Sequence, residues 1–261
     1  SVLIPQLRDL YAQAVSPANI ERLLAGLRHS ARGTREYDDI IVVLRALGRH
    51  AVDALFSRLI HEDDRTTRLL LLGIFRQLGG GSVRYLVRRL HHGEWYVVRN
   101  AVYIIGQVGD RSVIPVLRQC LEHEDERVVR EVVNAVATIG GPDAEMVLFK
   151  AMENSSPVIA GAAAEWLGRL GVQDAAPLCL AKLEQDGFAS RRKLPLALGL
   201  VHALGLVAGE EALPVLKQIV SRRRISLSPE YKELVAAGQA AIERIRHRSV
   251  PWSTGQGRSH A

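Results

Sequence analysis

Three histidines recur along the chain at a constant spacing. His61, His92 and His123 lie 31 residues apart, and Glu62 and Glu124 directly follow two of them. Imidazole and carboxylate groups together are common metal ligands. A zinc ion needs its ligands at about 2 Å, whereas packed helices lie about 8–10 Å apart, so neighbouring repeats bring such side chains together only with help. We therefore interpret these histidines as polar loop positions, with a metal site as the alternative and no cofactor indicated.

A second set of candidate residues is basic. Arg or Lys recurs in the segment before each of these histidines and in the corresponding segments further along the chain. Such a stripe suits a phosphate backbone or an acidic peptide. Cations near a helix C-terminus also offset the helix dipole, and no aromatic residues are interleaved for stacking on bases, so a purely structural role is the alternative. The candidate binding residues are Arg58, Arg88, Arg89, Arg118, Lys150, Lys182 and Lys217.

Common catalytic motifs are missing from the sequence. It contains no GxxxxGK[ST], GxSxG or HExxH pattern, and the glycine run at 79–81 has no preceding strand that would make it a phosphate cradle. The basic runs at 191–193 and 222–224 are interpreted as solvated loops. No catalytic residue is therefore indicated.

The elements that position these residues are repeated helices. An apolar residue followed by Gly recurs at steps of 31, 30, 31, 31 and 34 residues. Each Gly is expected at a sharp turn that ends a helix, in the left-handed conformation that glycine adopts without steric cost. The turn glycines are Gly48, Gly79, Gly109, Gly140, Gly171 and Gly205.

The segment before each of these glycines has helical periodicity. Apolar residues at i, i+3, i+4 and i+7 predict one buried helix face. The four aligned faces are Val98, Ala101, Val102 and Ile105; Val129, Val132, Val133 and Val136; Ala160, Ala163, Ala164 and Leu167; and Thr67, Leu70, Leu71 and Ile74. Second helices are expected after the glycines, at about 50–62, 81–92, 111–123, 142–154, 173–185 and 210–222.

Polar positions repeat as well. Asp63, Glu94, Asp125 and Ser156 precede the first helices, where Asp and Ser can cap free N–H groups and Glu suits the positive end of the dipole. Arg68, Arg99 and Arg130 follow the first three of these positions by five residues. An acid and an Arg at one height in every unit predict a ladder between repeats.

This pattern resembles the HEAT-repeat family, and specifically its short bacterial phycobilin-lyase-like variety. The resemblance lies in EWYVVRNAVYIIGQVGDRSVIPVLRQCLEHE (94–124) and DERVVREVVNAVATIGGPDAEMVLFKAMENS (125–155), and extends over about residues 34–222. It implies an all-α fold, a right-handed α-solenoid of antiparallel helix pairs. We expect a divergent repeat or cap at 1–33, repeats at 34–222, a capping helix at 223–249 and a flexible tail at 250–261.

Composition allows a sizeable core, and its mild positive charge permits nucleic acid or an acidic protein as partner without demanding either. Of its 261 residues, 48% are hydrophobic, and the net charge is +6. Cys120 and Cys179 form no disulfide framework, which favours a reducing, cytoplasmic location, and no apolar stretch is long enough to span a membrane. The chain begins at Ser1 rather than Met, as expected of a fragment or processed form of a longer protein.

Three functions are compatible with these features. We expect a non-catalytic scaffold that recognises a protein partner through the concave face or rim, with nucleic-acid binding through the basic stripe as the first alternative. The second alternative is a bilin lyase-type or metal-dependent HEAT enzyme subunit. A di-iron hydroxylase family with HEAT-like repeats carries His-Glu pairs near the Val-Arg position, which here holds Arg99-Asn100 and Arg130-Glu131. DNA glycosylases of similar fold use an aromatic and Asp cleft that the Trp spacing does not reproduce.

Overall fold

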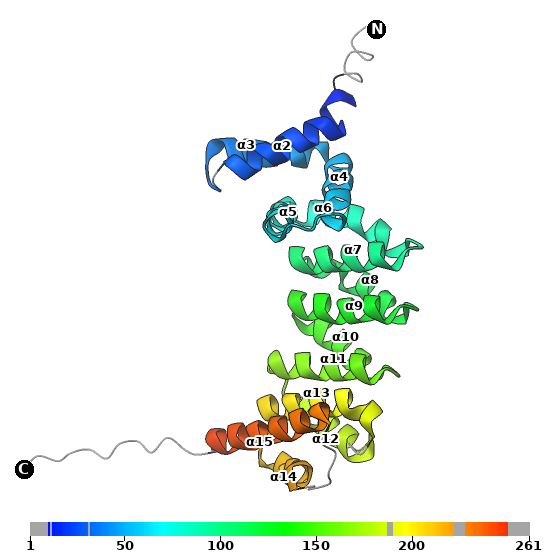
Figure 1. The fold of residues 1–261 in the computed structure, drawn as a ribbon, viewed down its shortest axis with the longest axis vertical. Coiled ribbons are helices and arrows are strands. Elements are labelled where there is room, and N and C mark those ends of the chain that lie inside the picture. Colours follow the sequence, from blue (N-terminus) through cyan, green and yellow to red (C-terminus); the bar gives the residue numbers. More distant parts are fainter. Residues whose placement is uncertain (1–9, 11, 31, 187–189, 222–227, 250–261) are drawn as a thin grey trace, which may run out of the picture. The chain divides into compact units, whose positions relative to one another are not determined.

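The computed structural model describes residues 10, 12–30, 32–186, 190–221 and 228–249 (Figure 1). Within these residues the chain folds into helices joined by turns, with no strand. The predicted all-α solenoid of paired helices is confirmed. The chain divides into two compact units, Ser1–Ile139 and Gly140–Ala261, here called unit 1 and unit 2.

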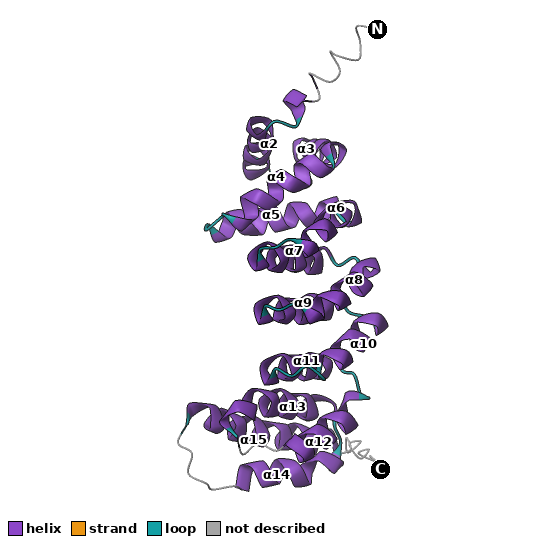
Figure 2. Cartoon of the chain, turned by 90° about the vertical axis from the view of Figure 1, so that its right-hand side faces the viewer, coloured by secondary structure: helices purple, strands orange, loops and turns teal. Residues whose placement is uncertain are grey.

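Unit 1 stacks helical hairpins. Its elements are α2 (Pro17–His29), α3 (Arg35–Leu47), α4 (Arg49–Ile60), α5 (Arg65–Leu78), α6 (Gly80–Leu86), η1 (Val87–His91), α7 (Trp95–Val108), η2 (Arg111–Val113), α8 (Ile114–Gln119), η3 (Cys120–Glu122) and α9 (Glu126–Ile139). The first helices α5, α7 and α9 form one layer, and the shorter second helices α6 and α8 lie beside them (Figure 2).

Unit 2 follows the same plan and ends on a long helix. Its elements are α10 (Pro142–Ala151), α11 (Pro157–Arg169), α12 (Ala175–Asp186), η4 (Arg191–Lys193), α13 (Leu194–Val207), η5 (Glu210–Ala212), α14 (Leu213–Ser221) and α15 (Pro229–Ser249). The terminal helix α15 packs against α13 and α14. Its apolar residues Leu234, Ala237, Ala241 and Ile245 form one buried face, as suits the capping helix expected at 223–249. The proposed boundaries of cap, repeats and tail stay a prediction.

Five of the six predicted turn glycines have positive φ, as required of a left-handed turn: 52° at Gly48, 63° at Gly79, 79° at Gly109, 68° at Gly140 and 74° at Gly171. The prediction for Gly205 is wrong, because α13 continues through it to Val207. A Cβ at Gly205 would lie 3.0 Å from Cα of Ala241 in α15. This glycine therefore permits close helix packing and does not end a helix.

The predicted apolar stripes of α7, α9 and α11 are buried without exception. In α5 the stripe is shifted by one residue. The buried residues are Leu71, Leu72, Ile74 and Phe75, whereas Thr67 and Leu70 are half-buried. The step from this repeat to the next is 30 residues, as it is between their turn glycines, and one residue rotates a helix face by about 100°. The constant spacing of 31 was the wrong assumption here.

The same shift moves a helix cap. Asp64, rather than the predicted Asp63, is the N-cap of α5, and its Oδ2 accepts the N–H of Thr67 at 2.7 Å. That hydrogen bond lowers the pKa of the Asp64 carboxyl. Ser156 caps α11 as predicted. Glu94 lies at the N-cap of α7 without a side-chain cap bond, so its contribution is through its charge alone.

Small residues set the distance between first helices. A Cβ at Gly106 of α7 would lie 2.7 Å from Cα of Ala135 in α9, and one at Gly168 of α11 would lie 2.5 Å from Cα of Ala203 in α13. The backbones therefore approach too closely for any side chain at these two positions. The periodicity argument placed these glycines inside helices but did not predict this role.

Some predicted features lie outside the described residues. These are residues 1–9 of the expected cap, the basic run at 222–224 and the expected tail at 250–261. The other basic run, at 191–193, lies in η4. No helix in the described part of the chain is long and apolar enough to cross a membrane.

Candidate functional site

The turn between each second helix and the next first helix needs a hydrogen-bond acceptor. Nδ1 of His92 accepts the N–H of Glu94 at 3.0 Å, and Nδ1 of His123 accepts the N–H of Asp125 at 2.9 Å. Asn154 accepts the N–H of Ser156 in the same way. A backbone N–H can only donate, so the neutral ring carries its proton on Nε2. The repeated imidazole therefore satisfies the N–H of the residue that begins the next helix.

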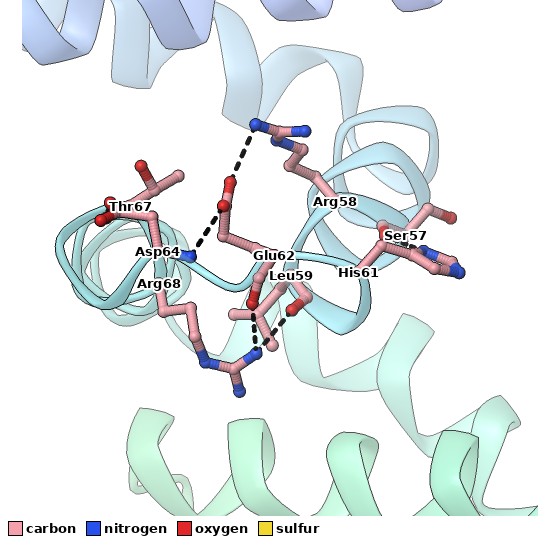
Figure 3. Close-up of polar contacts among 8 residues, drawn as sticks. All are labelled: Ser57, Arg58, Leu59, His61, Glu62, Asp64, Thr67 and Arg68. Atoms are coloured by element: carbon pink, nitrogen blue, oxygen red, sulfur yellow. Dashed lines mark hydrogen bonds and ion pairs between the residues drawn. The ribbon is translucent and has the colours of Figure 1, made fainter.

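The first turn of the series uses a different residue. Figure 3 shows Glu62 accepting the N–H of Asp64 at 3.1 Å, while the Arg58 guanidinium lies 2.8 Å from its second oxygen. Arg68 reaches back and donates to the carbonyls of Leu59 and Glu62, both at 3.0 Å, which closes the C-terminal end of α4. The acceptor is thus a carboxylate here, an imidazole in two turns and an amide in a fourth.

His61 has the opposite role to the other two histidines. Its Nδ1 lies 2.8 Å from the carbonyl oxygen of Ser57, so this nitrogen is the donor (Figure 3). No group of three or more His, Cys, Asp or Glu side chains within the described ranges is placed to hold a metal ion. The structure thus gives each of the candidates His61, His92 and His123 a backbone hydrogen bond within its own turn.

The predicted acid–arginine ladder is wrong in its partners. Arg68 binds carbonyls, and Arg99 in α7 pairs across the stack with Glu131 in α9, 3.1 Å away, rather than with an acid at a helix start. Glu131 is buried, and its burial raises the pKa of that carboxyl although Arg99 acts against the shift. A second link between the two helices places the Arg127 guanidinium 3.4 Å from the centroid of the Trp95 ring.

A different arginine series does connect the repeats. Arg45 of α3 donates to the carbonyl of Gln77 near the end of α5, at 2.9 Å. Arg76 of α5 donates to the carbonyl of Gln107 near the end of α7, at 3.1 Å. The last carbonyls of a helix have no partner within it, so each arginine completes a neighbouring helix. The 31-residue spacing of Arg45 and Arg76 was visible in the sequence but was not recognised.

The candidate basic residues differ in their surroundings. Arg58 and Arg89 are half-buried and paired with acids, Glu62 and Asp53 respectively. Lys150 pairs with Glu153 at 2.7 Å, which lowers the pKa of that glutamate. Arg88, Arg118 and Lys217 are exposed, and Lys182 is half-buried.

These bases do not form a single row. One buried residue repeats at 31-residue steps in the second helices, as Leu55, Leu86 and Leu117 in unit 1. Arg58 and Arg89 each lie three residues after the repeated leucine of their own helix. Arg88 lies two residues after it, and Arg118 lies one residue after it. Because each residue turns a helix by about 100°, the side chains leave their helices in different directions.

Positive charge is concentrated on the second helices of unit 1. The segments α4, α6–η1 and η2–α8–η3 contain seven arginines against two acids, a net charge of +5. In unit 2, α10, α12 and η5–α14 contain three lysines against six acids, a net charge of −3. The "basic face" of unit 1 is here defined as Arg49, Arg58, Arg84, Arg88, Arg89, Arg111 and Arg118.

Two pockets open between the second helices of unit 1. One, of about 260 Å³, lies between α4 and α6–η1. It is lined by Arg49, Asp53, Tyr85, Arg88, Arg89 and His92. The other, of about 540 Å³, lies between α2 and α4 and is lined by Arg58 and His61, by the acids Glu21 and Asp53, and otherwise by apolar and neutral residues. The structure thus places five of the ten candidate positions in two defined pockets. Arg88, Arg89 and His92 line the first, and Arg58 and His61 line the second, together with partners that the sequence did not indicate.

The two thiols are not candidates for chemistry. Both Cys120 and Cys179 are free, and burial raises the pKa of each. For Cys179 the pKa rises to about 12, so the unreactive thiol is the form present near neutral pH.

Paired helices stacked in layers, joined by glycine turns and buried along one face, define the class of helical-repeat solenoids. Within this chain, residues 83–155 match the family model for HEAT repeats. This stretch therefore consists of HEAT repeats, and the predicted HEAT family is confirmed there. No curated protein matches the sequence.

Several solved structures are similar at low sequence identity. Human deoxyhypusine hydroxylase in complex with glycerol is 15% identical, with 88% of this chain and 97% of that chain covered and a TM-score of 0.35. The complex of CpcE and CpcF of phycocyanin lyase from Nostoc sp. PCC7120 is 20% identical, with coverage of 85% and 94% and a TM-score of 0.36. A designed armadillo repeat protein is 18% identical, with coverage of 73% and 98% and a TM-score of 0.39.

Proposed function

We propose that the chain is a non-catalytic binding scaffold that recognises an acidic segment of a protein partner through the basic face of unit 1. The observation that carries this proposal is the contrast between the second helices of the two units, at +5 and −3. A net charge excess of this kind attracts acidic partners and raises their rate of association.

The exposed part of the basic face supports the same proposal. Arg88, Arg111 and Arg118 are exposed, and no acid pairs with them among the described residues. Their charges are thus available to a partner without breaking an existing ion pair. Their divergent directions favour an irregular acidic protein segment over the regular phosphate spacing of a nucleic-acid strand.

A charge-reversal experiment tests the proposal. Binding of a fluorescent acidic peptide is measured by anisotropy for the wild type, for the triple variant Arg88→Glu, Arg111→Glu and Arg118→Glu, and for a matched control in unit 2. The control, Lys150→Glu, Lys182→Glu and Lys217→Glu, makes the same change in net charge. We expect the unit 1 variant to lose on the order of tenfold or more in affinity, and the control to stay close to the wild type.

Three results would contradict the proposal. Equal losses in both variants would show that only total charge matters. An oligonucleotide that binds more tightly than the peptide, with a steeper dependence on salt, would favour nucleic acid as the partner. Stoichiometric iron or zinc in the purified protein would oppose a non-catalytic role.

A further inference from the structure

Five of the six residues that line the pocket between α4 and α6–η1 have side chains that carry hydrogen-bond donors. These five are Arg49, Arg88, Arg89, Tyr85 and His92, and the pocket has a volume of about 260 Å³. Nδ1 of His92 already accepts a backbone N–H, so its Nε2 carries the hydrogen of the neutral ring. The Tyr85 oxygen accepts from Nη2 of Arg84 at 2.7 Å.

The one acid in this pocket is already neutralised. Oδ2 of Asp53 accepts from Nε of Arg49 at 3.2 Å, and Oδ1 accepts from Nη2 of Arg89 at 2.6 Å. The pocket therefore holds three positive charges and one negative charge, a formal excess of two, and both oxygens of its carboxylate are engaged. Such a pocket attracts an anion and offers a cation little to bind.

Two of the three arginines, Arg49 and Arg89, are held in place before any ligand arrives. The Arg89 guanidinium lies over the Phe56 ring, 4.2 Å from its centroid, while Asp53 holds one of its edges. Arg49 is held by the same carboxylate. Fixing donors in advance reduces the entropy that binding would otherwise cost. Arg88 is exposed and has no partner among the residues that the structure describes, so its donors are free.

The presence of arginines rather than lysines does not by itself indicate a phosphate site, because the whole chain contains 29 Arg and only 5 Lys. The charge balance of the pocket does indicate phosphate. A carboxylate would leave the pocket with one uncompensated positive charge, whereas a phosphomonoester carries about −1.5 to −2 at neutral pH and matches the excess of two. Its three terminal oxygens also accept from several guanidinium edges at once.

We infer that this pocket binds the phosphomonoester of a phosphorylated residue, within the acidic segment that the basic face recognises. This inference rests on the proposed function and names its partner more closely. The phosphate engages Arg88 and the free edges of Arg49 and Arg89, while the rest of the acidic segment lies along the exposed arginines outside the pocket.

The test compares three acidic peptides that differ at one central residue, which is phosphoserine, serine or aspartate. Anisotropy is measured with the wild type, with Arg88→Gln and with Arg118→Gln. The two substitutions remove the same charge from exposed positions on the same face, but only Arg88 lines the pocket. Thermal unfolding of each variant verifies that the fold is retained.

We expect the phosphoserine peptide to bind the wild type on the order of tenfold more tightly than either other peptide. Arg88→Gln should abolish most of that difference, whereas Arg118→Gln should weaken all three peptides alike and preserve it. If the three peptides bind equally, the phosphate site is wrong while the acidic scaffold stands. If none binds, the proposed function itself fails.

Two further outcomes would overturn the inference. Loss of the phosphoserine preference to the same extent in both variants would place the phosphate outside the pocket. Inorganic phosphate that competes as strongly as the phosphopeptide itself would show that no peptide segment is recognised beyond the anion.

Discussion

The contact between α7 and α9 gives a sharp test of how the repeats are spaced. We predict that Gly106→Ala destabilises unit 1, although alanine favours helices by about 1 kcal/mol over glycine. A Cβ at this position would lie 2.7 Å from both Cα and Cβ of Ala135. Contacts this short with a backbone atom are relieved only by moving one helix away from the other.

The expected magnitude follows from two opposing terms. Overpacking a close-packed site costs about 1–3 kcal/mol, and contact with backbone rather than a flexible side chain places this site in the upper part of that range. Subtracting the gain in helix propensity leaves a loss of about 1–2 kcal/mol. For a chain of this size, each kcal/mol lowers Tm by about 2–4 °C.

The assay is urea unfolding followed by circular dichroism, together with hydrogen exchange of the amides in α7 and α9. Gly81→Ala is the matched control, because Gly81 lies in α6 and a Cβ there meets nothing within 4 Å. The control should be unchanged or more stable by up to about 1 kcal/mol. Ala135→Gly alone should cost about 1 kcal/mol in helix propensity, and it should cost less in the presence of Gly106→Ala, because it removes one of the two short contacts. Equal or greater stability of Gly106→Ala than of the wild type would refute the close-approach argument.

Three more predictions concern single residues. Burial raises the pKa of Glu131, so the contribution of this group to stability should be fully present below the ordinary glutamate pKa and should be lost as pH rises through the raised value. In urea unfolding at several pH values, the difference in stability between the wild type and Glu131→Gln should follow this dependence. His123→Asn should preserve stability, because an Asn side chain accepts the equivalent backbone N–H in unit 2, at Asn154. His123→Leu removes the acceptor and should lower the free energy of unfolding by about 0.5–1.5 kcal/mol. Equal stabilities of the two variants would show that the acceptor is not needed. Gly140→Val should lower Tm, because φ at this residue is 68° and a β-branched residue adopts a positive φ only at a cost of about 1–3 kcal/mol. An unchanged Tm would contradict the assignment of Gly140 to a left-handed turn.

The sequence predicted the repeat well because the repeat depends on local chemistry. Glycine turns and apolar periodicity are properties of short segments, and each segment was compared with its neighbours at the same spacing. The errors came from assuming one spacing throughout. At α5 a single missing residue rotates the buried face and moves the cap to Asp64. At Gly205 the spacing widened to 34 residues, and the glycine serves packing instead of a turn.

The candidate site was less predictable, because pairings across the stack depend on side-chain direction. The sequence indicated Arg88, Arg89 and His92 separately, but not their meeting with Asp53 and Tyr85 in one pocket. It placed lysines of unit 2 in the same class as arginines of unit 1, although acids outnumber those lysines on their own helices. Counting acids together with bases on each second helix would have revealed this difference from the sequence.

The arginines that complete helix ends have a consequence for the exchange of repeats. The end of α7 is completed from the preceding repeat, by Arg76, whereas the end of α4 is completed from the following one, by Arg68. A repeat in the middle of unit 1 thus serves neighbours on both sides. Excising α5 and α6 would bring Arg45 to the position from which Arg76 acts, but would leave α4 without the donor that Arg68 supplies. A transplanted α5–α6 repeat therefore keeps these native hydrogen bonds only if the repeats on both sides of it are transplanted with it.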